Sequence, residues 1–354
     1  MSFASVPHES RKSIDRAGHI LVNDHANPLE YALAIELADQ WRACHAYPIN
    51  TFQATLREKI KNYSDGSIVA QRLKRMPTII DKLKRFPDMQ LSNMQDIGGV
   101  RAILGSIKEV YDLAAEYKIK SRFAHELLTE RDYINQPRDE DGYRSLHLIY
   151  KYKNARNPNY DNLRLELQIR TKLQHTWATA VETMGTFLGQ ALKSRQGDQE
   201  WLDFFAITSS AFAKLEKSPA IPRFKHLSTQ DTFLAVADAE AKLGALIKMR
   251  GLSTAVDFIG ENRKGWSYHL IILKSLERRV QVKSYNRDGL EQATVELAKL
   301  EKEASEGRKI EPVLVSAGPV NVLRRAYPNF FLDISEFVKT VDKIISSASR
   351  GNSS

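Results

Sequence analysis

The sequence contains a single cysteine, Cys44, among 354 residues. One cysteine excludes a disulfide framework and any zinc site built from several thiolates, and we expect Cys44 to be a small buried apolar residue. No run of about 18 apolar residues is present, which excludes a membrane-spanning helix, and the polar N-terminus lacks the apolar core of a secretory signal. These absences predict a cytoplasmic protein with no membrane partner.

Two common nucleotide-binding motifs are also missing. The chain has neither the G-x-x-x-x-G-K-[ST] loop that cradles phosphates nor the G-x-G-x-x-G turn of dinucleotide-binding folds. If this protein is an enzyme that acts on nucleotides, it therefore belongs neither to the P-loop enzymes nor to the dinucleotide-binding enzymes. Apolar residues make up 42% of the chain and charged residues 27%, which is ordinary globular composition and excludes a mostly disordered protein.

Positive charge is in excess. The 52 Lys and Arg outnumber the 43 Asp and Glu, which gives a net charge of +9. The excess is densest from residue 221 onward, where 21 basic residues stand against 16 acidic ones. Such a balance favours polyanionic partners such as nucleotides or RNA.

The length predicts about two domains. Residues 1–26 are polar and without a clear period, whereas residues 27–218 alternate between helical and strand patterns. Residues 219–229 carry two prolines and no periodicity, so we expect a linker there. Residues 230–354 have the order α-β-β-α-β-α, which predicts a small sheet covered by helices, of unknown role.

The element pattern before the linker is mixed. Helices are expected at 28–47 and 51–64, and on either side of Pro77 within residues 67–86, where the proline interrupts or begins a turn. Strands are expected at 98–104, 144–153 and 163–171, and a long helix follows. The predicted fold class is therefore α/β (α+β).

A basic segment is the first candidate site. Six cations and one acid lie between Arg72 and Arg85. If the segment is helical, Arg72 and Arg75 share a face to which Lys82 nearly returns. That face could bind a triphosphate, or it could simply be a solvated helix surface.

Two carboxylates form the second candidate. Asp96 precedes a predicted strand and is followed by two glycines and Arg101, whereas Glu166 lies in a strand with Gln168 and Arg170 on the same face. Mg²⁺ binds few carboxylates and takes its other ligands from substrate phosphates, so two carboxylates on neighbouring strands suit it. A strand with one solvated face would show the same alternation.

The third candidate is the segment that contains Gly142 and Tyr143. A glycine just before an aromatic residue lets the ring sit in an open loop, where it could stack on a base. On its own, such a pair of residues is more often structural.

Together, in this order and at these distances, the segments resemble the synthetase domain of the RelA/SpoT family, which makes the (p)ppGpp alarmones. The resemblance covers roughly residues 30–215. The matching residues are Arg72, Lys74 and Lys82, then Asp96 to Arg101, then Asp132-Tyr133-Ile134, Pro137-Arg138 and Gly142 to His147, and finally Glu166 to Thr171 with Trp177 in the next helix.

The resemblance implies a nucleotidyltransferase-like mixed β-sheet flanked by helices. It also implies a Mg²⁺-dependent pyrophosphokinase that moves the β,γ-diphosphate of ATP to a 3′-hydroxyl, with Glu166 also a candidate to activate that hydroxyl. The roles it implies are catalysis by Asp96, Glu166 and Arg101, ATP binding by Arg72, Lys74, Lys82 and Arg101, metal binding by Asp96 and Glu166, and acceptor binding by Tyr143, His147, Gln168 and Arg170.

Several positions depart from the family pattern. Arg138 replaces a lysine and Asp141 replaces an asparagine, and with Asp139 and Glu140 this predicts an acidic patch beside the acceptor loop. No His-Asp dipeptide occurs in the chain, so we expect synthesis without the hydrolysis that long family members perform.

Three functions remain open at this point. The first is a small alarmone synthetase that uses GDP or GTP. The second is a toxin-type synthetase that modifies the 3′ end of tRNA and is controlled by its C-terminal domain. The third is a nucleotide sensor without catalysis. ATP is the expected donor in the first two, and the sequence leaves homo-oligomerisation open.

Overall fold

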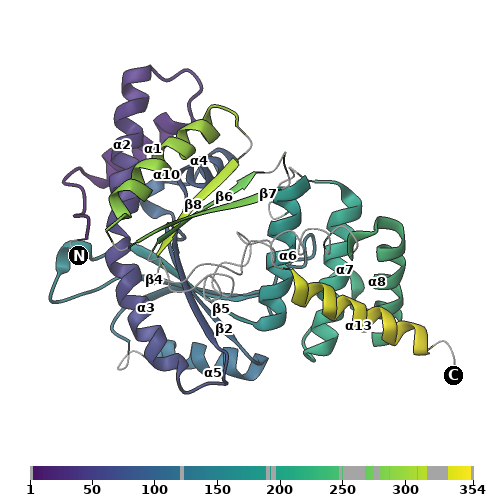
Figure 1. Cartoon of the computed structure of the whole chain (residues 1–354). Helices are drawn as coiled ribbons and strands as arrows, with labels where there is room; N and C mark the ends of the chain where they lie inside the picture. The colour runs from purple at the N-terminus through teal and green to yellow at the C-terminus, as the bar shows by residue number, and fades with distance from the viewer. Residues whose placement is uncertain are drawn as a thin grey trace. The chain divides into compact units, whose positions relative to one another are not determined.

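The computed structural model is shown in Figure 1. Contacts divide the chain into two units, Met1–Asp132 with Ser145–Thr171, and Tyr133–Arg144 with Lys172–Ser354. No helix among the described residues is long and apolar enough to cross a membrane. The residues that the structure describes are 3–119, 123–188, 192, 197–246, 249, 268–274, 277, 279–286, 288–308, 310–316 and 334–351.

The first unit is built on a five-stranded mixed sheet with the strand order β1-β2-β5-β4-β3. Strands β2 and β5 are parallel, and the other neighbours are antiparallel. This arrangement confirms the predicted mixed sheet flanked by helices. The strands are β1 (Ile68–Leu73), β2 (Gly98–Leu104), β3 (Glu126–Asp132), β4 (Leu146–Lys151) and β5 (Arg164–Thr171).

Helices α3 and α5 cover the apolar face of this sheet. A Cβ on Gly98 would lie 2.6 Å from Leu165 Cδ2 and 3.0 Å from Ile49 of α3, so strand and helix approach closely there. On the same face Tyr150 donates a hydrogen bond to the Tyr117 carbonyl of α5 (2.9 Å). The opposite face is therefore free of these two helices. The helices of this unit are α1 (Arg11–Val22), α2 (Pro28–Cys44), α3 (Ala46–Ile60), α4 (Met76–Arg85) and α5 (Ile107–Lys118).

Two expectations for this unit were wrong. No regular element was expected in residues 1–26, but residues 11–22 form a helix. The Ser10 hydroxyl caps this helix, and Ile14 and Leu21 are buried on it. Residues 68–73 form a strand rather than a helix, because they pair along their whole length with β2. Pro77 lies in the first turn of α4, so it begins that helix. Cys44 is fully buried, as predicted.

In the second unit, four helices share one apolar core. Phe204 and Phe205 pack in it against Phe337, and Trp177 donates its indole N–H to the Phe205 carbonyl (2.8 Å). The four helices are α6 (Lys172–Leu188), α7 (Gln199–Leu215), α8 (Thr229–Leu243) and α13 (Ser335–Gly351).

The division into units differs from the predicted domain boundary. Residues 219–229 lie inside the second unit, and Ile221 next to the short helix η4 (Pro222–Phe224) is fully buried. Helices α8 and α13 pack with α6 and α7 because their apolar residues complete that core. They were expected to cover the C-terminal sheet instead.

The C-terminal sheet has three antiparallel strands in the order β7-β6-β8. Leu270 and Ile272 of the sheet pack with Ala293 and Leu300 of α10. The described elements follow the expected order along the chain. They are β6 (Tyr268–Lys274), β7 (Arg279–Tyr285), α10 (Leu290–Ser305) and β8 (Ile310–Ser316).

Candidate active site

Strand register places the motif side chains of the first unit on one face of its sheet. In β5, Glu166 and Gln168 share a face because side chains alternate along a strand. Arg101 of β2 and His147 of β4 both lie opposite Gln168, so they share that face. Arg72 of β1 lies opposite Gly99, which in turn lies opposite Glu166. Four strands therefore contribute to one polar surface.

Glu166 is the centre of a hydrogen-bond network on this surface. His147 Nδ1 lies 2.9 Å from Glu166 Oε1, and Gln168 Nε2 donates to Glu166 Oε2 at 2.6 Å. Arg101 Nε donates in turn to Gln168 Oε1 at 3.2 Å. The network fixes the carboxylate in one orientation and uses both of its oxygens.

The electrostatics of Glu166 keep it ionised. Its side chain is buried, which by itself opposes the charged form, but the charge and hydrogen bond of His147 outweigh burial and lower the pKa of Glu166 to about 2. Asp96 acts in the opposite direction, so the two carboxylates are close enough to influence each other. Glu166 is therefore an anion at neutral pH.

Asp96 joins two lysines from different elements. Lys74 Nζ lies 2.9 Å from Asp96 Oδ2, and Lys82 Nζ lies 2.8 Å from Asp96 Oδ1. Lys74 directly follows β1, and its backbone N–H donates to the Ile97 carbonyl at 2.8 Å. Lys82 lies on α4. The residue that follows β1 and the last turn of α4 thus bring both cations to the carboxylate of Asp96, which precedes β2.

The charges of Lys74, Asp96 and Lys82 shift one another's pKa values. Burial lowers the pKa of Lys74 below its ordinary value, and the charge of Asp96 opposes part of that shift. Burial also opposes ionisation of Asp96, but the two ammonium groups outweigh it and hold its pKa well below the ordinary range. Two cations around one anion leave a net positive charge, which suits a phosphate chain.

The remaining predicted residues of the first unit differ in exposure. Arg72 is exposed on the polar face, and its positive charge contributes to lowering the pKa of Lys74. Arg170 shares the face of Glu166 and Gln168 but is only 2% exposed, so it lies deeper than the others.

The loop of residues 133–144 belongs to the second unit. The guanidinium of Arg138 lies 4.7 Å from the ring centroid of Tyr143, and Tyr133 contacts that ring edge-on at 5.8 Å. Asp141 pairs with Arg138 (2.6 Å) and accepts a hydrogen bond from the Tyr143 backbone N–H (3.0 Å). Asp141 is buried, so its charge is balanced within the loop and does not add to an open acidic patch.

The donor types fit Mg²⁺ in a limited way. Among the described residues, no group of three or more His, Cys, Asp and Glu side chains is arranged to hold a metal. Asp96 and Glu166 offer two carboxylates, which is the number that Mg²⁺ commonly takes from a protein when phosphates supply further ligands. The pair therefore fits a metal that arrives with a nucleotide, and it does not fit a metal held by protein alone.

Two contacts between these residues were not expected from the sequence. Lys74 and Lys82 were expected to bind phosphates, but both contact Asp96, and His147 was expected on the acceptor side, but it contacts Glu166. The second was detectable, because an antiparallel pairing of the two alternating strands around residues 154–162 brings His147 to the polar face of β5.

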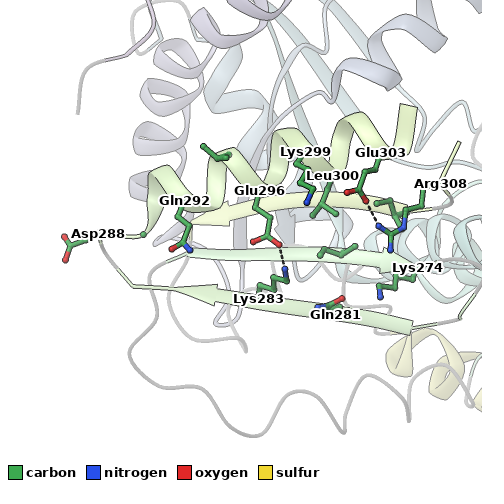
Figure 2. Close-up of a pocket in the computed structure, with 14 residues that line it drawn as sticks. Lys274, Gln281, Lys283, Asp288, Gln292, Glu296, Lys299, Leu300, Glu303 and Arg308 are labelled. Carbon is green, nitrogen blue, oxygen red and sulfur yellow. Dashed lines mark hydrogen bonds and ion pairs between the residues drawn. The ribbon is translucent and has the colours of Figure 1, made fainter. Parts of the chain in front are cut away.

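A separate hollow of about 720 Å³ lies between α10 and the C-terminal sheet (Figure 2). Glu296 pairs there with Lys283, and Glu303 pairs with Arg308. None of the motif residues lines this hollow.

Comparison with known proteins agrees with the motifs. Residues 71–185 match the family described as "Region found in RelA / SpoT proteins". "GTP pyrophosphokinase YjbM" of Bacillus subtilis (strain 168) is 30% identical over 127 residues, which are 35% of this chain and 59% of that protein. "GTP pyrophosphokinase YwaC" of the same organism is 32% identical over 117 residues, 30% of this chain and 52% of that protein.

The chain is also similar to solved structures. The crystal structure of small alarmone synthetase 1 from Bacillus subtilis bound to pppGpp matches 49% of this chain and 89% of that chain, with 21% identity and a TM-score of 0.41. The matches to the curated relatives span little more than half the length of those proteins. The similarity is therefore to a region found in RelA and SpoT proteins, and it spans residues 71–185 of this chain.

Proposed function

We propose that this chain is an ATP-dependent nucleotide pyrophosphokinase that converts GDP or GTP into (p)ppGpp. The observation that carries the proposal is the pair of clusters in the first unit, Lys74–Asp96–Lys82 and His147–Glu166–Gln168, within the region matched to RelA and SpoT proteins. The names of the relatives YjbM and YwaC, both GTP pyrophosphokinases, support the same class of reaction.

In the proposed reaction, the acceptor's 3′-oxygen forms a bond to the β-phosphorus of ATP. The bond between that phosphorus and the oxygen bridging to the α-phosphate breaks, and AMP leaves with the bridging oxygen. The proton of the 3′-hydroxyl is released to solvent. Such a transfer depends on charge neutralisation and alignment more than on a strong nucleophile.

The cations of the first unit supply the charge neutralisation. Lys74 and Lys82 already converge on an anion, and phosphate oxygens would take the place that the Asp96 carboxylate holds in the present structure. Arg72 and Arg101 add two guanidinium groups that suit phosphate or adenine.

Mg²⁺ would be held by Asp96 and Glu166 together with the phosphates of ATP. When bound, it would neutralise charge that develops on the transferred group. Glu166 has a low pKa, so it is a weak proton acceptor at neutral pH. We therefore assign it to metal binding and to accepting a hydrogen bond from the 3′-hydroxyl, which aligns that group.

On the acceptor side, Tyr143 is the proposed stacking partner for the base. His147 and Gln168 orient Glu166, and Arg170 is proposed to pair with acceptor phosphate. A guanine nucleotide is the proposed acceptor because both named relatives are GTP pyrophosphokinases.

The test is a transfer assay with purified full-length protein, Mg²⁺ and ATP labelled at the γ-phosphate. GDP, GTP, adenine nucleotides and bulk tRNA are offered as acceptors in parallel. Label on guanine nucleotides supports the proposal. Label on tRNA alone would replace the acceptor with RNA and make the C-terminal region its candidate control element. Absence of label on every acceptor, from protein shown to bind ATP, would contradict the proposed activity and favour a sensor.

A further inference from the structure

The loop that carries Tyr143 is tied to helix α7 by two side chains. Arg144 is 2% exposed, and its Nε donates to Ser209 Oγ at 3.1 Å. Ser209 Oγ donates in turn to the Gly142 carbonyl at 2.5 Å. Both chain neighbours of Tyr143 are therefore attached to the same serine of α7.

Arg144 also joins the two ends of this loop to a later segment. Its Nη1 donates to the Ile134 carbonyl at 3.3 Å, and its Nη2 donates to the Pro219 carbonyl at 2.5 Å. Burial lowers the pKa of Arg144 to about 10, with Glu216 opposing the shift, so the guanidinium is still charged at neutral pH. Hydrogen bonds from a charged donor are stronger than those from a neutral donor.

Gly142 shows how closely the loop approaches the helix. Its φ is +72°, a conformation that glycine adopts without strain. A Cβ at this position would lie 2.8 Å from Ser209 Cβ and 3.3 Å from Ala206 Cα. The backbone of the loop at Gly142 therefore packs directly against α7. The contact needs both this glycine and a small residue at position 209.

A further contact holds the outer part of the loop. The backbone N–H of Arg223 donates to Asp139 Oδ1 at 2.9 Å, and the Arg223 guanidinium pairs with Asp203 of α7 at 2.9 Å. The residues that support the loop thus come from α7 and from residues 219–223. All of them lie beyond residue 185, where the matched synthetase region ends.

We propose that Arg144 and Ser209 are positioning residues that fix Tyr143 for the acceptor base, and this rests on the proposed function. Because both neighbours of Tyr143 are hydrogen-bonded to Ser209 of α7, the backbone at Tyr143 is held in place. The guanidinium of Arg138 then packs over the Tyr143 ring. Helix α7 is thereby part of the acceptor machinery, although none of its residues belongs to a synthetase motif. Neither residue needs to touch substrate.

The first test compares Ser209→Ala with the matched control Thr208→Val in the full chain. Thr208 is also buried on α7, but its hydroxyl donates only to the Phe204 carbonyl within the helix. We expect Ser209→Ala to raise the acceptor KM about fivefold or more while the ATP KM changes less than about twofold. Thr208→Val should leave both constants unchanged. Equal effects on the two KM values, or none, would overturn the positioning role.

A second readout does not depend on catalysis. Hydrogen exchange of the amides of residues 138–145 is measured in the wild type and in both variants. Ser209→Ala should speed exchange of these amides about fivefold or more, and Thr208→Val should not. If the wild type transfers nothing to any acceptor, the proposed function fails while this result still decides whether Ser209 holds the loop. Unchanged exchange in Ser209→Ala would overturn the attachment itself.

Arg144→Lys provides a third comparison. Lysine keeps the charge but cannot reach Ser209, Ile134 and Pro219 together, because it lacks the planar fork of arginine. Exchange of the loop amides should rise in this variant as in Ser209→Ala. A lysine variant that exchanges and binds acceptor as the wild type does would show that charge alone suffices, and it would contradict the three-way attachment.

Discussion

The ammonium of Lys74 lies 2.9 Å from the Asp96 carboxylate, and only 7% of the lysine side chain is exposed. A buried cation is stable only with a partner, and Asp96 is that partner. The same lysine is proposed to bind ATP phosphate. The ion pair therefore holds in place the cation that we propose for binding phosphate.

Removing the Asp96 charge should abolish transfer. We expect Asp96→Asn to lower kcat about 100-fold or more, because a proposed metal ligand is lost, and to lower the free energy of unfolding by on the order of 1–3 kcal/mol, because Lys74 is left beside a neutral amide. Asp81→Asn is the matched control, since Asp81 is an exposed carboxylate of α4 that pairs with Arg85. Steady-state kinetics and urea unfolding measure both effects. An Asp96→Asn enzyme with wild-type kcat would remove Asp96 from the site.

Lys82 should act mainly on ATP. Lys82→Met is expected to raise the ATP KM about tenfold, because one of the two cations that we propose for binding the phosphates is lost. Lys84→Met changes the same residue type on the same helix, but Lys84 is half-exposed and pairs with exposed Asp24. That control should keep the wild-type KM. Equal KM values for the two variants would show that Lys82 has no specific role.

Stability in acid should reveal the environment of Glu166. Its pKa is about 2 in the folded protein and 4.5 when unperturbed, so the unfolded chain binds more protons in this range. Its contribution is fully present above about pH 4.5, is lost as the pH falls toward about 2, and is on the order of 3 kcal/mol. The free energy of unfolding is measured with urea at about pH 5 and about pH 3. It should fall less between these two pH values in Glu166→Gln than in the wild type. Parallel losses would contradict the His147–Glu166 pairing.

Tyr143 should act through its ring and not its hydroxyl. We expect Tyr143→Ala to raise the acceptor KM about tenfold, since stacking of a base on an aromatic ring is worth ~1–3 kcal/mol. Tyr143→Phe should stay within about twofold of the wild type, because the ring is kept. Initial-rate kinetics at saturating ATP separate the two. If alanine and phenylalanine behave alike, stacking is not the role of Tyr143.

Much of the site was predictable because it depends on local pattern. Glu166, Gln168 and Arg170 alternate with apolar residues, and that alternation alone places them on one face of β5. Asp96 precedes a strand that the pattern also identifies, and Arg101 lies within that strand. The order of the motifs then predicted the similarity of these separate segments to a region found in RelA and SpoT proteins.

The rest depended on tertiary contacts. Residues 68–73 read as part of a basic helix, and only pairing with β2 makes them a strand. Helices α8 and α13 carry apolar stripes that fit either a sheet or other helices, and the shared core decides between the two. The attachment of Arg144 to Ser209 joins residues 65 positions apart, which no local pattern reveals.

The most direct test of the account is the fate of the nucleotide left behind by ATP. The wild type is incubated with Mg²⁺, ATP and the acceptor that becomes labelled, and AMP, ADP and product are quantified together over time. Transfer of a diphosphate predicts one AMP for each product molecule and no matching ADP. One ADP for each product molecule would show transfer of a single phosphate and would contradict a pyrophosphokinase.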